Sequence, residues 1–335
     1  MDADELLGAY LKGDRNFSNE SLKEIDLSHA NLVDINLSQA NLEKAVLIFT
    51  ELTRANLAQI YGVKAQLSGA NLSETNLELA DLQQADFHGA ILEKANLVNA
   101  NLSSASLIDS NLMKANLQGT NLKGADLTGA CLFGAVLIST EGEKGQNEPT
   151  KLKQVVFERT DLEGICFDQL DLTQATLMAA NLTRSSLRQT NLEEANLRET
   201  NLISANLSGA NLRYANLRDA NLMKASLEGA DLTGADLTGA DLKEANLLEV
   251  ILNEANLSQV NLQKATMVAS SLKSANLTGV DLTEANLTWA NLTRANLTNA
   301  NVNHTDLTGA DLNHTNWTNV NLERLTLPFL KEGDS

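Results

Sequence analysis

Six side chains could bind a metal ion or serve as nucleophile and base, and their spacing decides whether they can act together. Imidazole and thiolate ligands must reach one ion at about 2.0–2.3 Å, and a nucleophile needs its base within hydrogen-bonding distance. These side chains are His29, His88, Cys131, Cys166, His304 and His314. No two lie close in the sequence, so only the fold could bring them together.

A five-residue repeat determines which elements carry these side chains. Residues 230–247 read ADLTGADLTGADLKEANL: a small residue, Asp or Asn, Leu, then two variable residues. On an α-helix a five-residue step turns successive leucines about 140° apart, and on a continuous strand an odd step sends them to opposite sides. Neither element gives one apolar face. Within a unit, however, the small residue and the Leu share a side, which predicts a very short strand followed by a corner.

Four such units with corners near a right angle close a square coil of twenty residues. Successive coils would then stack at about 4.8 Å, the spacing of parallel strands. We therefore expect an all-β, four-sided parallel β-helix of about fifteen coils, right-handed by analogy with parallel crossovers. Glycine at the second variable position, as in Gly229, Gly234 and Gly239, suits the corners.

This motif resembles the pentapeptide-repeat family, whose fold is a right-handed quadrilateral β-helix, over roughly residues 15–327. In addition, DELLGAYLKGDRNF followed by SLKEIDLSHANL is similar to the openings of cyanobacterial members, including a regulator of heterocyst differentiation. The resemblance implies a regulatory protein that acts by binding another protein.

The pattern predicts a helical cap at residues 1–14, one repeat domain at 15–327 and a tail at 328–335. In DELLGAYLK, Leu7, Tyr10 and Leu11 would lie on one side and cover the first coil. LTLPFL at 325–330 would cap the other end or form a two-fold dimer contact, so a monomer and a C-terminal homodimer both stay open.

Three places depart from the repeat. Gly62 occupies a central position, where we expect a bulge or kink, and Leu170 stands where Ala is usual. Residues 140–149, TEGEKGQNEP, have almost nothing to bury and read as a protruding loop. Asparagines precede the central residue at twenty-residue steps on both sides of this loop: Asn36, Asn56, Asn76, Asn96 and Asn116 before it, and Asn196, Asn216, Asn256, Asn276, Asn296 and Asn316 after it. We therefore expect the loop to leave the numbering of the faces unchanged.

An interior filled by leucine and small residues leaves no room for a cofactor, so function should lie outside. His304 and His314 would be on opposite faces, and His29 and His88 about three coils apart, too far to share a metal. Exposed carboxylates such as Glu193 and Glu194 have no cleft to raise a pKa, and no phosphate-binding glycine motif is present. We expect a protein that is not an enzyme and has neither cofactor nor metal.

The net charge of the chain restricts the kinds of molecule that it could bind. The formal net charge is −18 and the pI about 4.6, which disfavours direct binding to nucleic acid or an anionic membrane. The opening lacks a signal-peptide pattern and no apolar run approaches about 18 residues. We expect a cytoplasmic protein with a protein partner.

One face has an unusual composition. By number, the face of Leu27, Leu127, Phe167 and Leu187 carries no Lys outward, and Arg188 is its only Arg. Its outward apolar residues are the candidate partner-binding residues: Ile48, Phe49, Ile108, Leu248, Val268 and Trp289. The candidate loop contacts are Glu141, Glu143, Lys144, Gln146, Asn147 and Glu148.

Three functions compete. The first is an interaction scaffold that regulates a protein partner through this face, the loop or both. The second, which the family resemblance also implies, is an acidic DNA mimic that binds or protects a type II topoisomerase such as gyrase. Its predicted charge density is about one net charge per 4 Å of coil stack, less than half that of duplex DNA, and Lys and Arg interrupt the acids in LEEANLRET. The third is a rigid spacer with no specific partner.

Overall fold

The computed structural model of the chain describes residues 1–138 and 150–325. The chain divides into two compact units, Met1–Asp171 (unit 1) and Leu172–Ser335 (unit 2), and each is described by itself. The predicted loop at 140–149 and the tail at 328–335 lie outside the described residues, as does all of LTLPFL except Leu325.

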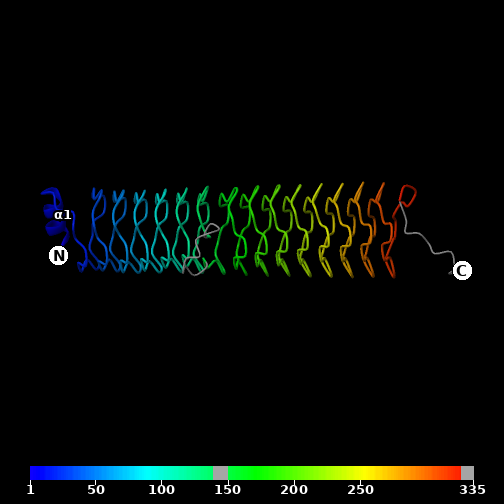
Figure 1. Cartoon of the computed structure of the whole chain (residues 1–335), viewed down its shortest axis with the longest axis horizontal. Coiled ribbons are helices and arrows are strands. Elements are labelled where there is room, and N and C mark those ends of the chain that lie inside the picture. Colours follow the sequence, from blue (N-terminus) through cyan, green and yellow to red (C-terminus); the bar gives the residue numbers. More distant parts are fainter. Residues whose placement is uncertain (139–149, 326–335) are drawn as a thin grey trace. The chain divides into compact units, whose positions relative to one another are not determined.

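The chain opens with helix α1, Ala3–Leu11, which lies at the N-terminal end of unit 1 (Figure 1). The Asp2 side chain accepts a hydrogen bond from the Glu5 N–H at 2.9 Å, and the Glu5 carboxylate accepts one from the Asp2 N–H at 3.1 Å. This reciprocal capping box satisfies two backbone donors that the first turn would otherwise leave without partners.

The helix packs through a different set of residues from the one expected. Leu6 is fully buried, whereas Leu11 is 84% exposed. Leu6 and Tyr10 are four residues apart and so share a helix face, and the Tyr10 hydroxyl donates to the Val33 carbonyl at 2.9 Å. The expectation for Leu11 was wrong because the helical stripe passes through Leu6.

Each five-residue unit contributes one bridge residue to a parallel ladder. In unit 1 the bridges run from Asn16↔Asn36 to Cys131↔Asp161, and in unit 2 from Thr176↔Asn196 to Asn296↔Asn316. Except across residues 139–149, the partners are twenty residues apart, so four five-residue repeats make one coil. Figure 1 shows these coils stacked within unit 1 and within unit 2. The predicted short strand and corner of each five-residue repeat are confirmed, while the handedness of the β-helix stays a prediction.

The corner is a β-turn that places its third residue in the left-handed region. In the first full coil, the Leu22 carbonyl accepts from the Ile25 N–H at 3.2 Å, and Glu24 between them has φ 57°. L-residues rarely adopt this region, but the Glu24 N–H donates to the Glu43 carbonyl of the next coil at 2.9 Å. Because this inter-coil bond recurs around the coil, the ladder holds dozens of non-glycine residues in a conformation they disfavour alone.

Leucine and small side chains fill the interior of each coil. Ala230, Leu232, Ala235 and Leu237 are all fully buried. Where threonine takes the small position its hydroxyl donates to a backbone carbonyl, as Thr50 does to Leu27 at 2.9 Å. Among the described residues, Ser270 has the only buried side-chain oxygen without a hydrogen-bond partner.

The segment at 139–149 shifts the numbering of the faces, contrary to expectation. On its two sides the bridge partners are thirty residues apart, as in Asn121↔Lys151 and Asp126↔Val156. The coil is complete with ten residues added to it, so Leu127 is followed on its face by Phe157 and not by Phe167. Ten residues are half a coil, and steps of twenty counted across the loop therefore lead to the wrong face.

The expected kink at Gly62 is also absent. The Gly62 N–H donates to the Asp81 carbonyl at 2.7 Å, and the Gly62 carbonyl accepts from Ala65 at 3.0 Å, as in any other unit. A Cβ at Gly62 would lie 2.9 Å from Leu82 Cδ2 and 3.4 Å from Ile60 Cδ1. Ile60, at a position usually held by Ala, fills the space that a central Leu occupies elsewhere, and the ladder continues undisturbed.

Candidate partner-binding surfaces

The structure does not gather the histidines and cysteines into a site. His29 stacks on the Phe49 ring with centroids 5.5 Å apart, and both cysteines are free. Burial raises the pKa of the Cys166 thiol, which keeps it protonated. Among the described residues, no three His, Cys, Asp or Glu side chains could hold a metal ion.

The adjacent carboxylates Glu193 and Glu194, for which the sequence predicts no catalytic role, take part in ordinary surface hydrogen bonds. Glu194 accepts from the Gln174 side-chain amide at 2.7 Å, and Glu193 accepts from Asn211 Nδ2 at 3.5 Å. Both belong to the polar surface of unit 2, and neither lies in a described cleft.

The candidate residues fall into two groups, one on each unit. In unit 1 they lie on the Leu27 face, which we define by the central residues Leu27, Leu47, Leu67, Phe87, Leu107, Leu127 and Phe157. In unit 2 they lie on the Leu187 face, defined by Leu187, Leu207, Leu227, Leu247, Met267, Leu287 and Leu307. The count that placed both groups on one face rested on the incorrect numbering across residues 139–149.

On the Leu27 face, Phe49 is 61% exposed while Ile48 and Ile108 are half-buried. The Phe49 ring covers Gly69 of the next coil, since a Cβ there would lie 2.2 Å from Phe49 Cε1. Because Phe157 continues this face, Arg159 belongs to it and pairs with Glu158 at 3.1 Å. The expectation that the unit 1 part of the face lacks cations is therefore wrong.

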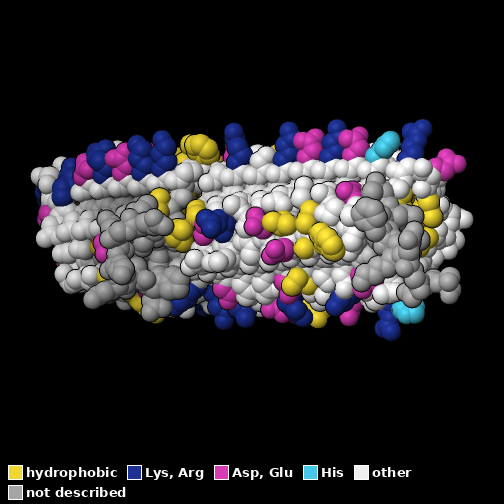
Figure 2. Space-filling view, turned by 45° about the vertical axis from the view of Figure 1, so that its right-hand side comes forward, with side chains coloured by type: hydrophobic (Ala, Val, Ile, Leu, Met, Phe, Trp, Pro, Cys, Tyr) yellow, Lys and Arg dark blue, Asp and Glu magenta, His cyan; other side chains and the backbone are white. Residues whose placement is uncertain are grey.

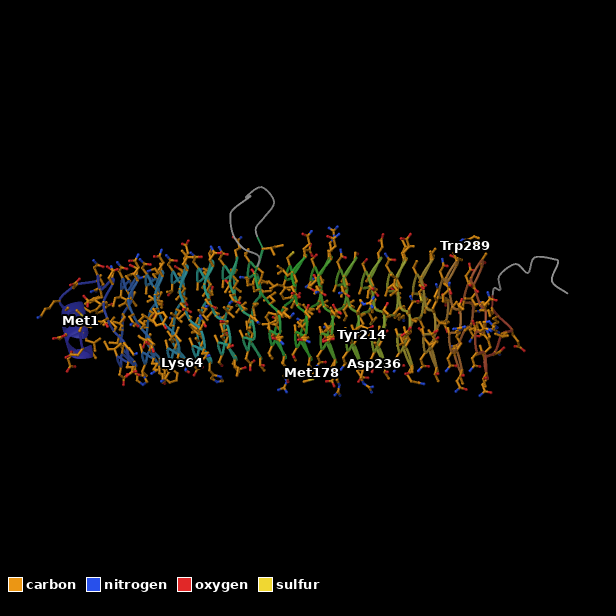
Figure 3. All side chains as sticks on the ribbon, turned by 90° about the horizontal axis from the view of Figure 1, so that it is seen from below. Met1, Lys64, Met178, Tyr214, Asp236 and Trp289 are labelled. Carbon is orange, nitrogen blue, oxygen red and sulfur yellow. The ribbon has the colours of Figure 1, made fainter. Side chains whose placement is uncertain are left out.

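On the Leu187 face, Trp289 is 69% exposed and points outward from the ribbon (Figure 3). Its ring covers Gly309 of the next coil, where a Cβ would lie 2.4 Å from Trp289 Cε3. Leu248 and Val268, on the two preceding coils, are half-buried. We call these three residues the apolar strip, because they lie on one face in three consecutive coils.

A pairing rule links these exposed aromatics, and it could have been found in the sequence. An aromatic residue at the third turn position is followed twenty residues later by glycine, which leaves room for the ring. Phe49 with Gly69, Tyr214 with Gly234 and Trp289 with Gly309 follow this rule. Tyr214, 55% exposed with the Arg213 guanidinium 5.6 Å from its ring centre, was not among the candidates.

Opposite charges are interleaved on the other faces. Lys23 pairs with Glu43 at 2.9 Å, Arg54 with Asp34 at 2.8 Å and Lys94 with Glu74 at 3.3 Å, each between coils twenty residues apart. Figure 2 shows basic and acidic side chains side by side along the upper edge of the view. The acidic excess is therefore broken by cations on these faces.

The region described contains no helix that is both long and apolar enough to cross a membrane. The model of the pentapeptide repeats (8 copies) matches the chain in overlapping segments. The matched residues are 21–59, 63–97, 95–134, 156–193, 175–213, 190–229, 200–239, 230–268, 251–288, 270–309 and 305–327. With the twenty-residue coils, these matches show that the chain belongs to the pentapeptide-repeat family, whose fold is the quadrilateral β-helix.

Several solved structures are similar to this chain. HetL, a pentapeptide repeat protein involved in heterocyst differentiation regulation from the cyanobacterium Nostoc sp. strain PCC 7120, is 37% identical over 74% of this chain and 97% of its own, with a TM-score of 0.56. Rfr23 from the cyanobacterium Cyanothece 51142 is 37% identical over 29% of this chain and 63% of its own, with a TM-score of 0.19. QnrB1, a plasmid-mediated fluoroquinolone resistance protein, is 16% identical over 67% of this chain and 90% of its own, with a TM-score of 0.38. No curated protein matches the chain.

Proposed function

We propose that this protein is a non-enzymatic scaffold that regulates a protein partner by binding it on an outer face of its coils. The observation that carries the proposal is the exposed indole of Trp289, which lies over Gly309 on a face that also carries Leu248 and Val268 on the two preceding coils. The likeness to HetL, a protein of heterocyst differentiation regulation, supports the regulatory part of the proposal.

Trp289 has the properties of a binding anchor. Tryptophan is among the residues that contribute most to protein interfaces, because its large ring removes much apolar surface from water on contact. The ring already rests on Gly309, so binding costs little side-chain ordering. An exposed aromatic side chain held in this way is preorganised for binding.

The charges around the strip indicate the partner's chemistry. Glu228, Glu249 and Asp306 lie on the Leu187 face, and its one cation is Arg188 at the first coil. Acidic groups around an apolar strip favour a partner with an apolar side chain flanked by Lys or Arg. The partner is therefore expected to be a basic protein surface.

Phe49 and Ile48 on the Leu27 face form a second, smaller candidate in unit 1. The Phe49 ring lies between His29 and Gly69 and is fixed in the same manner as Trp289. Ile108 lies three coils further along this face.

Topoisomerase mimicry is the weaker proposal, because a DNA mimic needs an uninterrupted acidic surface. Inter-coil ion pairs such as Lys23–Glu43 and Lys264–Glu284 interrupt the acids in both units. The spacer hypothesis gives no role to aromatics that are exposed and held in place.

A pull-down from the source cell at physiological salt tests the proposal, with the intact chain compared with Trp289→Ser. Tyr214→Ser is the matched control, since Tyr214 also lies over a glycine of unit 2 but on another face. A protein lost with Trp289→Ser and kept with Tyr214→Ser supports the scaffold. Recovery of gyrase subunits would favour the mimic, and no specific protein would favour the spacer. A variant lacking residues 140–149 tests the predicted loop contacts, which lie outside the described residues.

A further inference from the structure

Three lysines in unit 1 lie around one hollow on the surface, and this charge is opposite in sign to that of the chain. Lys123, Lys151 and Lys153 line the hollow, with a volume of about 320 Å³. All three are exposed. Asp171 is the one carboxylate among its lining residues, so the charges there sum to an excess of positive charge in a protein of net charge −18.

The backbone places these lysines together. Lys151 forms a bridge with Asn121, and the Gly124 N–H donates to the Lys153 carbonyl at 3.2 Å. Lys123 and Lys153 therefore occupy the same position of consecutive coils, about 4.8 Å apart along the stack. This neighbour relation exists because ten extra residues precede Lys151.

An earlier pair at the same position of this face carries opposite charges. Lys23 and Glu43 occupy the equivalent positions on earlier coils of this face and form an ion pair at 2.9 Å. At Lys123 and Lys153 two like charges meet instead, an arrangement that destabilises a sheet. Among the described residues, none of the three lysines forms an ion pair, so an anion from outside the chain would relieve the repulsion.

The floor of the hollow is apolar. Leu152 and Leu170 line it, and both are buried, with Leu170 4% exposed at a position that usually holds a small side chain. The three lysines that line the hollow can add apolar surface, because the methylene groups of a lysine can cover apolar side chains while its ammonium group stays in water. A ligand that fits has an apolar group for the floor and negative charge around it.

We infer that this hollow binds an acidic segment of a protein partner, in which one apolar side chain inserts between flanking carboxylates. The inference rests on the proposed function, because it takes a protein as the partner, and this acidic segment is separate from the basic surface expected at the Leu187 face. A nucleic acid is a poorer fit, since three lysines on a chain of net charge −18 cannot offset repulsion of a long polyanion. The volume suits one or two side chains.

A direct binding experiment on the full chain tests the inference. The probe is a tetramethylrhodamine-labelled peptide with one leucine flanked by two glutamates on each side, followed by fluorescence anisotropy. A second peptide replaces the glutamates with glutamine. We expect Lys123→Gln/Lys153→Gln to weaken binding of the acidic peptide about fivefold or more, and the glutamine peptide to bind as weakly to the intact chain.

Lys64→Gln/Lys114→Gln is the control, because it removes the same charge from unit 1 outside the hollow. It should leave binding within about twofold of the intact chain, and circular dichroism establishes that both variants fold. Equal weakening by both double variants, or equal binding of both peptides, would overturn the inference. Displacement of the acidic peptide by a single-stranded DNA at equal concentration would overturn the assignment to a protein segment. If the peptide fails to bind while the Trp289-dependent complex persists, only this inference falls.

Discussion

The coil at 230–249 and the coil that follows residues 139–149 share one backbone pattern but differ in what fills it. The first repeats Ala and Leu, as at Ala235 and Leu237, and both are fully buried. The second contains Val155, Phe157, Ile165, Phe167 and Leu170, which are also buried. The Phe157 and Phe167 rings contact across the interior with centroids 5.7 Å apart. The ladder therefore determines the coil, while the core accepts larger residues where they pack against each other.

The outer surfaces of the two coils differ as well. The bridge residues of the first are Asp231, Asp236, Asp241 and Asn246, whereas those of the second include Lys151, Val156 and Asp161. Asp231 accepts hydrogen bonds from the Thr233 N–H at 2.9 Å and from Arg213 at 3.1 Å. The regular coil has a polar network where the other has mixed charges.

The largest effect should come from breaking the aromatic pair. Phe157→Ala should lower the free energy of unfolding by about 3–5 kcal/mol, because it leaves a cavity opposite Phe167. Phe133→Ala, at an aromatic residue 47% exposed, should change it by no more than about 0.5 kcal/mol. Urea denaturation measures both. Equal losses would mean that the larger core of this coil does not depend on the ring contact.

A second irregular site extends the comparison. Ile60→Ala should cost about 2–5 kcal/mol and Gly62→Leu about 1–3 kcal/mol, since each alone upsets the filled volume. The double variant restores the usual Ala and Leu, so it should cost less than the sum, with a coupling of about 0.5–3 kcal/mol. Strict additivity in urea denaturation would contradict the view that Ile60 replaces the missing central side chain.

The coil at 230–249 should not tolerate the larger buried side chains that the coil after residues 139–149 contains. Ala235→Leu adds volume to an interior that is already filled, with no side chain removed elsewhere to make room, and should lower the free energy of unfolding by about 1–3 kcal/mol. Ala269→Leu, at an exposed turn position, should change it by no more than about 0.5 kcal/mol. Thermal unfolding followed by circular dichroism distinguishes them. A neutral Ala235→Leu would show that every coil can expand.

The smallest effect concerns the outer network. Burial alone would raise the pKa of Asp231, but hydrogen bonds from Thr233 and Arg213 outweigh it, so its pKa is lowered. A carboxylate whose pKa is lower in the folded state stabilises above its unfolded value, about 3.9, and this stability disappears as pH falls through the folded value. The free energy of unfolding should fall less between pH 5 and pH 2 in Asp231→Asn than in the intact chain, by on the order of 1 kcal/mol or less. An unchanged pH dependence in urea denaturation would exclude this network as its cause.

The sequence was most informative where the repeat is regular. The short strands, the turns with glycine at Gly234 and Gly239, and the buried Ala and Leu positions all follow from a five-residue period. It was misleading at Gly62, where a neighbour compensates, and in α1, where Leu6 packs in place of Leu11. Both errors concern which side chain fills a space, and this depends on residues in other units.

The candidate surfaces likewise include features that the sequence predicts and features that depend on residues elsewhere in the chain. Exposure of Phe49 and Trp289 could be inferred from their turn positions, and their glycine partners were visible at a spacing of twenty. Arg159 and the lysine hollow could not be placed, because both depend on the ten residues added before Lys151.

The sequence by itself determined the five-residue unit, the twenty-residue coil and the family, because each unit carries its own buried Leu and its own turn. Only the tertiary structure decided which unit follows which on a face across residues 139–149, and therefore that Lys153 lies beside Lys123. The physical reason is that nearly identical units can form the same inter-coil hydrogen bonds with one another. The repeat pattern alone cannot tell whether partners across residues 139–149 are twenty or thirty residues apart. The hydrogen-bonded ladder of the folded chain shows that they are thirty residues apart.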